Sequence, residues 1–148
     1  MLANLSPLTN IMAVRILVVD DHPVVRQGLR AILGDRGDWE IVDEGEDGIE
    51  AVEKAKELQP DIVVLDVGMP RMDGLEACRR IRKVVPKSEI LIVTQHDSAQ
   101  MMREALSAGA RGYVVKSDAA RDLPAAVDAL IQHRFFSARN QGGAGDSQ

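Results

Sequence analysis

Short apolar runs rich in β-branched residues alternate along this chain with longer amphipathic segments. Three of the runs, ILVV, IVVL and ILIV, are apolar at every position, which is typical of strands covered on both faces. Such alternation predicts parallel βαβ units joined by right-handed crossovers. We therefore expect an α/β fold, with a five-stranded parallel sheet flanked by five helices. The expected strands are Arg15–Val19, Trp39–Asp43, Asp61–Leu65, Glu89–Val93 and Gly112–Val115.

Amphipathic segments between and after these strands supply the helices. Two of them begin with an N-cap aspartate followed three residues later by glutamate, at Asp47 and Asp73. Gly34 and Gly109 fit helix C-caps. A proline deep inside a helix removes a hydrogen bond, so we expect the fifth helix to start late, with Pro124 in its first turn. The expected helices are Pro23–Leu33, Asp47–Gln59, Gly74–Val84, Ser98–Ala108 and, approximately, Asp122–His133.

Length and composition indicate a single domain that needs no disulfide bond to fold. A chain of 148 residues suffices for a single domain that buries roughly two-thirds of its unfolded surface. Cys78 is the only cysteine, which excludes a disulfide framework and a cysteine-based zinc site and favours a cytoplasmic location. We expect residues 1–13 to be a disordered extension, 14–136 to form the domain, and the polar, glycine-rich residues 137–148 to be a flexible tail or the start of a linker.

Charge and hydropathy argue against two classes of partner. The net charge is −5, and the 18 lysines and arginines form no run that could supply the positive field needed for nucleic-acid binding. No stretch approaches the ~18 consecutive apolar residues of a membrane span. The sequence therefore predicts neither direct nucleic-acid binding by this chain nor a membrane partner.

Reactive side chains follow four of the five expected strands, at the point where each strand ends. Asp20 and Asp21 follow the first strand, Asp66 the third, Thr94 the fourth and Lys116 the fifth. Each residue alone is most often a solvated turn, a cap or a surface residue. In an open parallel sheet, however, the carboxyl ends of the strands meet at one edge, where ligands bind. The sequence therefore predicts a site that combines three carboxylates, a hydroxyl and an ammonium group.

This combination of groups favours a metal-assisted phosphoryl transfer. Carboxylates 4 Å apart repel by about 4 kcal/mol per pair at an effective dielectric near 20, unless a proton or cation intervenes. Mg²⁺ is the natural cation, with Asp21 and Asp66 as direct ligands and Asp20 as a ligand through water. Asp66, which follows a buried strand singly, is the candidate nucleophile and would form an acyl phosphate. Lys116 and the Thr94 hydroxyl would contact the phosphoryl oxygens.

Four segments resemble the receiver domain of bacterial response regulators, the phosphoacceptor domain of two-component signalling. They are VVDDHP at Val18–Pro23, LDVGMPRMDG at Leu65–Gly74, LIVT at Leu91–Thr94 and GYVVK at Gly112–Lys116. The match spans about Val14–Phe136, and the Asp-Asp-His-Pro start is most similar to the NarL-like subfamily, whose receivers usually precede a LuxR-type helix-turn-helix DNA-binding domain. The resemblance implies a flavodoxin-like (βα)5 receiver fold.

The resemblance also implies roles for individual residues. Asp66 matches the phosphoacceptor, Asp20 and Asp21 the acidic pair at the Mg²⁺, and Thr94 and Lys116 the residues that contact the phosphoryl group. Gly68, two residues after the phosphoacceptor, matches the position whose backbone carbonyl binds the metal. Tyr113 matches the aromatic residue that acts with Thr94 as a switch.

The resemblance further implies partners and an output. The phosphate donor would be a histidine kinase or a phosphotransfer protein, and the phosphorylated form would bind a partner or form a homodimer. Output through protein contacts, or through a DNA-binding domain if the natural chain is longer, both fit the sequence. On the fourth helix we expect Met101 to face solvent as part of the partner surface, and expect the following residues to face the sheet: Met102, Ala105, Leu106 and Gly109.

Two other functions use similar chemistry or a similar fold. A phosphatase of the haloacid dehalogenase type would need a second aspartate two residues after the nucleophile, where this chain has Gly68. A flavin- or nucleotide-binding module would need a phosphate-binding loop after the first strand, where this chain has two carboxylates. We therefore expect a signalling module and not an enzyme.

Overall fold

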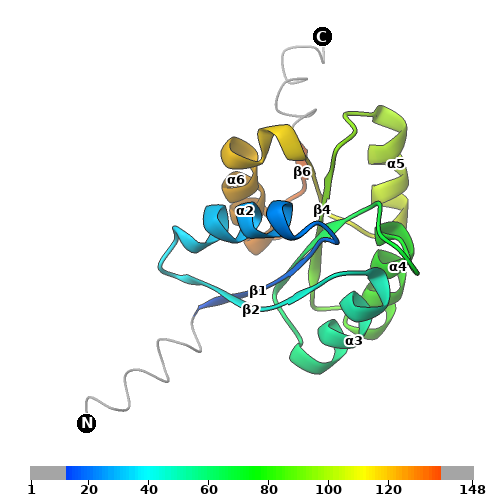
Figure 1. Ribbon diagram of the computed structural model, residues 1–148, viewed down its shortest axis with the longest axis horizontal. Coiled ribbons are helices and arrows are strands. Elements are labelled where there is room, and N and C mark those ends of the chain that lie inside the picture. Colours follow the sequence, from blue (N-terminus) through cyan, green and yellow to red (C-terminus); the bar gives the residue numbers. More distant parts are fainter. Residues whose placement is uncertain (1–12, 138–148) are drawn as a thin grey trace.

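The computed structural model describes residues 13–137, which form a parallel sheet with helices on both faces (Figure 1). The strands are β1 (Val14–Val19), β2 (Trp39–Gly45), β3 (Ile62–Asp66), β4 (Glu89–Thr94), β5 (Gly112–Val115) and β6 (Phe136–Ser137). The helices are α2 (Pro23–Gly34), α3 (Gly48–Leu58), α4 (Gly74–Val84), α5 (Ala99–Ala108) and α6 (Ala119–Ile131), with a 3-10 turn, η2, at Lys116–Asp118.

The expected α/β class, parallel sheet and five helices are confirmed. The strand order is β2-β1-β3-β4-β5-β6, so β2 is added on one side of β1 and β3 on the other, and the strand order reverses between β1 and β3. A sixth strand was not predicted: Phe136 and Ser137 pair with Gly112 and Tyr113 of β5. Two residues are too few to show a period, and only their pairing with β5 identifies them as a strand.

Both faces of the sheet are buried, which explains the continuously apolar strands. Helices α3, α4 and α5 cover one face and α2 and α6 cover the other (Figure 1). Alternate residues of β1 enter the two cores, with Leu17 and Val19 on the first face and Ile16 and Val18 on the second. The sheet is thereby held as a rigid layer whose carboxyl edge can position functional groups.

Most helix ends follow the predicted signals. Asp47 and Asp73 accept hydrogen bonds from the amides of the glutamates three residues later, at 2.9 Å in both cases. Gly109 ends α5 in the left-handed conformation, with φ of 109°. Gly34 is not the C-cap of α2; it is the last helical residue, and Asp35 follows it in a right-handed conformation.

The start of the last helix was predicted wrongly. Helix α6 begins at Ala119, directly after η2, and holds Pro124 in its interior. One face of the helix is buried against the sheet, including Leu123 and Val127, and this burial outweighs one lost hydrogen bond. The carbonyl that loses its donor belongs to Ala120, which is exposed and can be hydrated.

The expected terminal segments lie largely outside the described residues. Of the extension expected over 1–13 the structure describes only Ala13, and of the tail expected over 137–148 only Ser137, which is buried in β6. The limits of the domain therefore stay a prediction. Among residues 13–137, no helix has the length and hydropathy to cross a bilayer.

Candidate functional site

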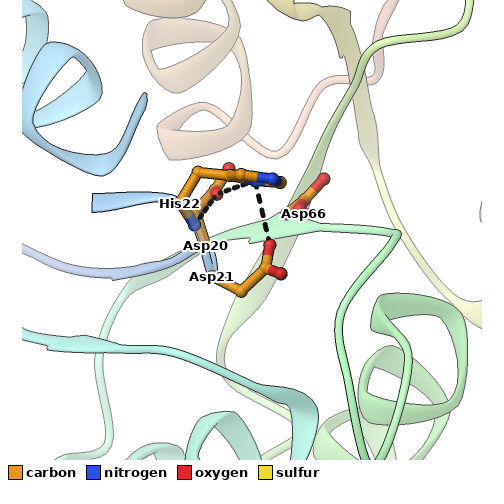
Figure 2. A group of neighbouring side chains, drawn as sticks. All are labelled: Asp20, Asp21, His22 and Asp66. Carbon is orange, nitrogen blue, oxygen red and sulfur yellow. Dashed lines mark hydrogen bonds and ion pairs between the residues drawn. The ribbon is translucent and has the colours of Figure 1, made fainter. Parts of the chain in front are cut away.

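The carboxyl ends of β1, β3 and β5 bring the predicted charged residues together. Val19 pairs with Leu65 in the β1–β3 register, so the next residues along the two strands, Asp20 and Asp66, lie side by side. Both are buried, at 0% and 5% exposure. Figure 2 shows Asp20, Asp21 and His22 beside Asp66 at this edge of the sheet. The site thus lies where the strand order reverses, as expected for this class of sheet.

An ammonium group links two of the carboxylates. Lys116 follows β5, and its Nζ lies 2.9 Å from Oδ2 of Asp20 and 3.2 Å from Oδ1 of Asp66. Burial, together with the charge of Asp20, raises the pKa of Asp66, and Lys116 opposes this shift only in part. Burial alone would lower the pKa of Lys116, but its hydrogen bonds to the carboxylates outweigh burial and raise it. Lys116 therefore remains charged as a fixed cation between two buried anions.

One ligand atom from each of four residues fits around a single ion. These atoms belong to Asp20, Asp21, His22 and Asp66, and all lie within 4.8 Å of one another. Nδ1 of His22 lies 3.4 Å from Oδ1 of Asp20 and 3.1 Å from Oδ1 of Asp21. His22 was not among the predicted metal ligands; its position directly after the aspartate pair was the signal that it could enter the site.

The charges of the cluster fit a hard divalent cation. Three carboxylates face the single ammonium of Lys116. Within residues 13–137, the buried Oδ1 of Asp21 accepts no hydrogen bond and has only the Nδ1 contact of His22. A buried carboxylate oxygen without a donor is costly. An oxygen-binding cation such as Mg²⁺ would relieve that cost, so the donor set fits the expected metal.

A cleft of about 260 Å³ opens beside the carboxylates. Three residues that were predicted to act on a phosphoryl group, Asp66, Thr94 and Lys116, all line it. Asp20 and Asp21 adjoin the cleft through Asp66 without lining it. The remaining lining residues are His22, Val67, Gly68, Gln95, His96 and Met101.

The loop after β3 supplies Gly68 and is tightly folded. The amide of Gly74 donates to the carbonyl of Val67 at 2.8 Å. A Cβ on Gly74 would lie only 1.9 Å from the carbonyl oxygen of Asp66, so a side chain there would push α4 away from the end of β3. Gly74 thus allows the loop to turn back directly beneath Asp66.

Thr94 and Tyr113, the two expected switch residues, bind the same loop. Oγ1 of Thr94 accepts from the amide of His96 at 3.2 Å. The Tyr113 hydroxyl donates to the carbonyl of His96 at 2.6 Å, and the ring is buried at 1% exposure. Tyr113 therefore already occupies an inward position in this structure, under the loop that joins β4 to α5.

The predicted orientation of α5 is wrong in part. Met101 does not face solvent: it is half-buried, packs on the core and lines the cleft. Leu106, expected to face the sheet, is 39% exposed. The face that meets the sheet runs through Met101, Ala105 and Ala108, a spacing of i, i+4 and i+7 that is rotated from the predicted face.

Comparison with known proteins identifies relatives over most of the chain. Residues 16–128 match the family model described as the response regulator receiver domain. The response regulator protein VraR of Staphylococcus aureus is 40% identical over 116 residues, which is 78% of this chain and 56% of VraR. The chain thus spans little more than half the length of this curated relative.

Two solved structures are similar to this chain in both fold and sequence. A two-component response regulator of the LuxR family from Aurantimonas sp. SI85-9A1 has a TM-score of 0.82 and 38% identity, covering 86% of this chain and 91% of that one. The signal receiver domain of the putative response regulator NarL from Mycobacterium tuberculosis has a TM-score of 0.78 and 33% identity, covering 82% and 98%.

Proposed function

Because this chain belongs to the response regulator receiver domain family, we propose that it accepts a phosphoryl group on Asp66 in a Mg²⁺-dependent reaction. The observation that carries the proposal is the convergence of Asp66, Lys116 and Thr94 on one cleft, beside the two further carboxylates of Asp20 and Asp21. The phosphoryl donor would be a histidine kinase or a phosphotransfer protein. In these donors a phosphohistidine carries the transferable group.

The reaction exchanges one phosphorus bond for another. A carboxylate oxygen of Asp66 attacks phosphorus in line, the phosphorus–nitrogen bond of the donor breaks, and the imidazole leaves with the bonding electron pair. Asp21, Asp66 and the Gly68 carbonyl would hold the metal directly, and Asp20 would hold it through water. The metal's contribution when bound is to offset negative charge on the carboxylates and the phosphoryl oxygens.

Lys116 and Thr94 would receive the transferred group. The Lys116 ammonium now contacts Asp66 at 3.2 Å, and it would turn to a phosphoryl oxygen once that carboxylate carries the phosphoryl group. The Thr94 hydroxyl, which lines the same cleft, would donate to a second oxygen. No acid stands at Gly68 to activate water, so the proposed site favours transfer over rapid hydrolysis, and the phosphatase alternative has no support.

The phosphorylated state would be read out through the loop between β4 and α5. Thr94 and Tyr113 both hold His96, so movement of the Thr94 hydroxyl toward phosphate would reposition this loop and the start of α5. The altered face would bind a partner protein or a second copy of the chain, or act on a DNA-binding domain in a longer natural protein. Our proposal includes neither direct nucleic-acid binding by this chain nor a membrane partner, and both of these absences stay predictions, as does a cytoplasmic location.

Labelling with acetyl phosphate and Mg²⁺ tests the proposed acceptor. Intact-mass spectrometry should show one added phosphoryl group on the wild-type protein and none on Asp66→Asn, because an amide is a poor nucleophile. Asp35→Asn, at an exposed residue that follows α2, is the matched control and should be labelled like the wild type. Labelling of Asp66→Asn to the wild-type extent would refute the assignment.

A further inference from the structure

The loop that carries Gly68 is fastened at its outer end to the start of α3. The carbonyl of Met72 accepts from the amide of Gly48 at 3.0 Å. The two backbones approach so closely that a Cβ on Gly48 would lie 2.2 Å from the Met72 oxygen. The loop is therefore docked onto a helix that is distant in sequence: Arg71 in the loop and Asp47 at the start of α3 are 24 residues apart.

A charged pair reinforces this backbone contact. The guanidinium of Arg71 binds Oδ2 of Asp47 through two nitrogens, with Nε at 2.9 Å. Asp47 is 4% exposed and is already engaged through Oδ1 as the N-cap of α3, accepting from Glu50. Burial would raise the pKa of Asp47, but these hydrogen bonds outweigh it and lower the pKa. The Asp47 carboxylate is thus held in its ionised form by the Glu50 amide and by Arg71 together.

The backbone of Arg71 indicates that its side chain is needed. Its φ is 67°, in the left-handed region that glycine adopts far more easily than arginine. A glycine at this position would relax the turn, but no other part of the loop could then reach Asp47 with a cation. The chain therefore keeps a strained arginine where the backbone alone favours glycine.

We propose that the ion pair between Arg71 and Asp47 positions the loop after Asp66, and so sets how tightly the site binds a divalent cation through Gly68. This inference rests on the proposed function. Arg71 is a positioning residue: it touches neither the carboxylates of the site nor the cleft. Its effect reaches the site because Gly68 and Arg71 share one short loop that is held at both ends.

Two measurements on the same variants test this proposal. Mg²⁺ titration followed by amide NMR gives the dissociation constant, and hydrogen exchange of the Gly48 amide in metal-free protein reports loop docking directly. We expect Arg71→Gln to raise the dissociation constant about fivefold, somewhat below the ~10–100-fold typical of residues that support metal ligands, because the Arg71 side chain is 59% exposed. The Gly48 amide should exchange about tenfold faster. Arg71→Lys, which keeps the charge, should restore most of both properties.

Four further variants, one of them a double variant, distinguish side-chain positioning from other causes. Arg71→Gly relaxes the backbone yet should weaken Mg²⁺ binding as Arg71→Gln does; wild-type affinity in this variant would overturn the proposal. Asp47→Asn keeps the cap of α3 but loses the charge, and combining it with Arg71→Gln should add no further loss. Arg80→Gln, which breaks an exposed ion pair to Glu76 on α4, is the control and should change neither measurement.

The outcome separates this inference from the proposed function. Wild-type affinity and wild-type Gly48 exchange in Arg71→Gln would overturn the inference alone, provided that the wild-type protein binds Mg²⁺. Absence of Mg²⁺ binding by the wild-type protein would instead overturn the proposed function, and with it the claim about affinity.

Discussion

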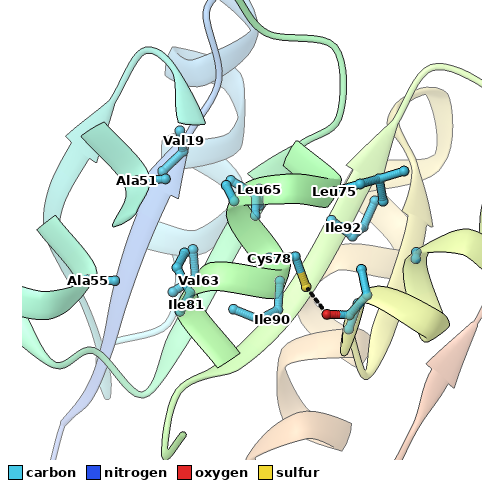
Figure 3. Close-up of a cluster of buried hydrophobic side chains, with 14 of the residues drawn as sticks. Val19, Ala51, Ala55, Val63, Leu65, Leu75, Cys78, Ile81, Ile90 and Ile92 are labelled. Carbon is cyan, nitrogen blue, oxygen red and sulfur yellow. Dashed lines mark hydrogen bonds between the residues drawn. The ribbon is translucent and has the colours of Figure 1, made fainter. Parts of the chain in front are cut away.

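At the residue scale, the properties of the site depend on which buried groups carry charge. Asp66 is buried among like charges, and its pKa is raised even though Lys116 is close. Cys78 shows the opposite case of a reactive residue made inert. Burial raises the pKa of its thiol to about 12, and its sulfur donates to the carbonyl of Ala108 at 3.4 Å within the core under α4 (Figure 3). These surroundings support a structural role for Cys78.

Removal of the Asp66 charge should stabilise the metal-free protein. A carboxyl whose pKa is raised by folding weakens the fold once it ionises, so the cost is absent at low pH and appears as the pH rises through the raised pKa. We expect Asp66→Asn to raise the free energy of unfolding at pH 7 by about 1 kcal/mol in urea denaturation. The gain should disappear near roughly pH 3, where the wild-type carboxyl is protonated. A variant less stable than wild type at pH 7 would contradict this view of the site.

At the element scale, the sequence predicts those features that depend on neighbours along the chain. The caps at Asp47 and Asp73 follow from short-range hydrogen bonding, and each could be located from a glutamate three residues later. The start of α6 could not be located in this way, because burial of the helix against the sheet outweighs the local effect of Pro124. The rotation of α5 was missed for a similar reason, since its buried face is set by packing against the core on the α3–α5 side of the sheet.

Two glycine substitutions should separate local propensity from close packing. Gly74→Ala places a Cβ 1.9 Å from the backbone oxygen of Asp66 and should cost more than about 3 kcal/mol of stability, because a backbone carbonyl cannot turn aside as a flexible side chain can. Gly28→Ala, inside α2, meets nothing within 4 Å and should stabilise the protein by roughly 0.5–1 kcal/mol. Urea denaturation of both variants measures these changes. Equal effects of the two substitutions would contradict the packing described at Gly74.

At the scale of the whole molecule, the two-sided core explains why the site could be predicted. Strands buried on both faces show as continuous apolar runs, and in a parallel sheet every residue that follows such a run lies at the same edge. Asp20, Asp66 and Thr94 follow such runs and Lys116 follows the short strand β5, and the structure brings all four to the same edge. The ion pair of Arg71 with Asp47 was not, because nothing along the chain reveals which loop docks on which helix.

The whole molecule also determines how a small change at Asp66 could reach the surface. Thr94 lies at the site, and Tyr113 lies in the core of the α3–α5 face. Thr94 accepts a hydrogen bond from the amide of His96, and Tyr113 donates one to its carbonyl. The loop at His96 leads directly into α5, whose N-cap is Ser98. A displacement of Thr94 therefore has a short physical path to an exposed helix.

The most direct test of the central claim is the amide NMR spectrum with and without beryllofluoride and Mg²⁺, since beryllofluoride mimics a phosphoryl group on an aspartate. We predict shifts at the cleft residues Asp66, Thr94 and Lys116, together with shifts at Tyr113 and along α5. The same additions should leave the spectrum of Asp66→Asn unchanged apart from effects of Mg²⁺ alone. Shifts confined to the cleft, with Tyr113 and α5 unmoved, would contradict the switch, and an unaltered wild-type spectrum would contradict the phosphoacceptor site itself.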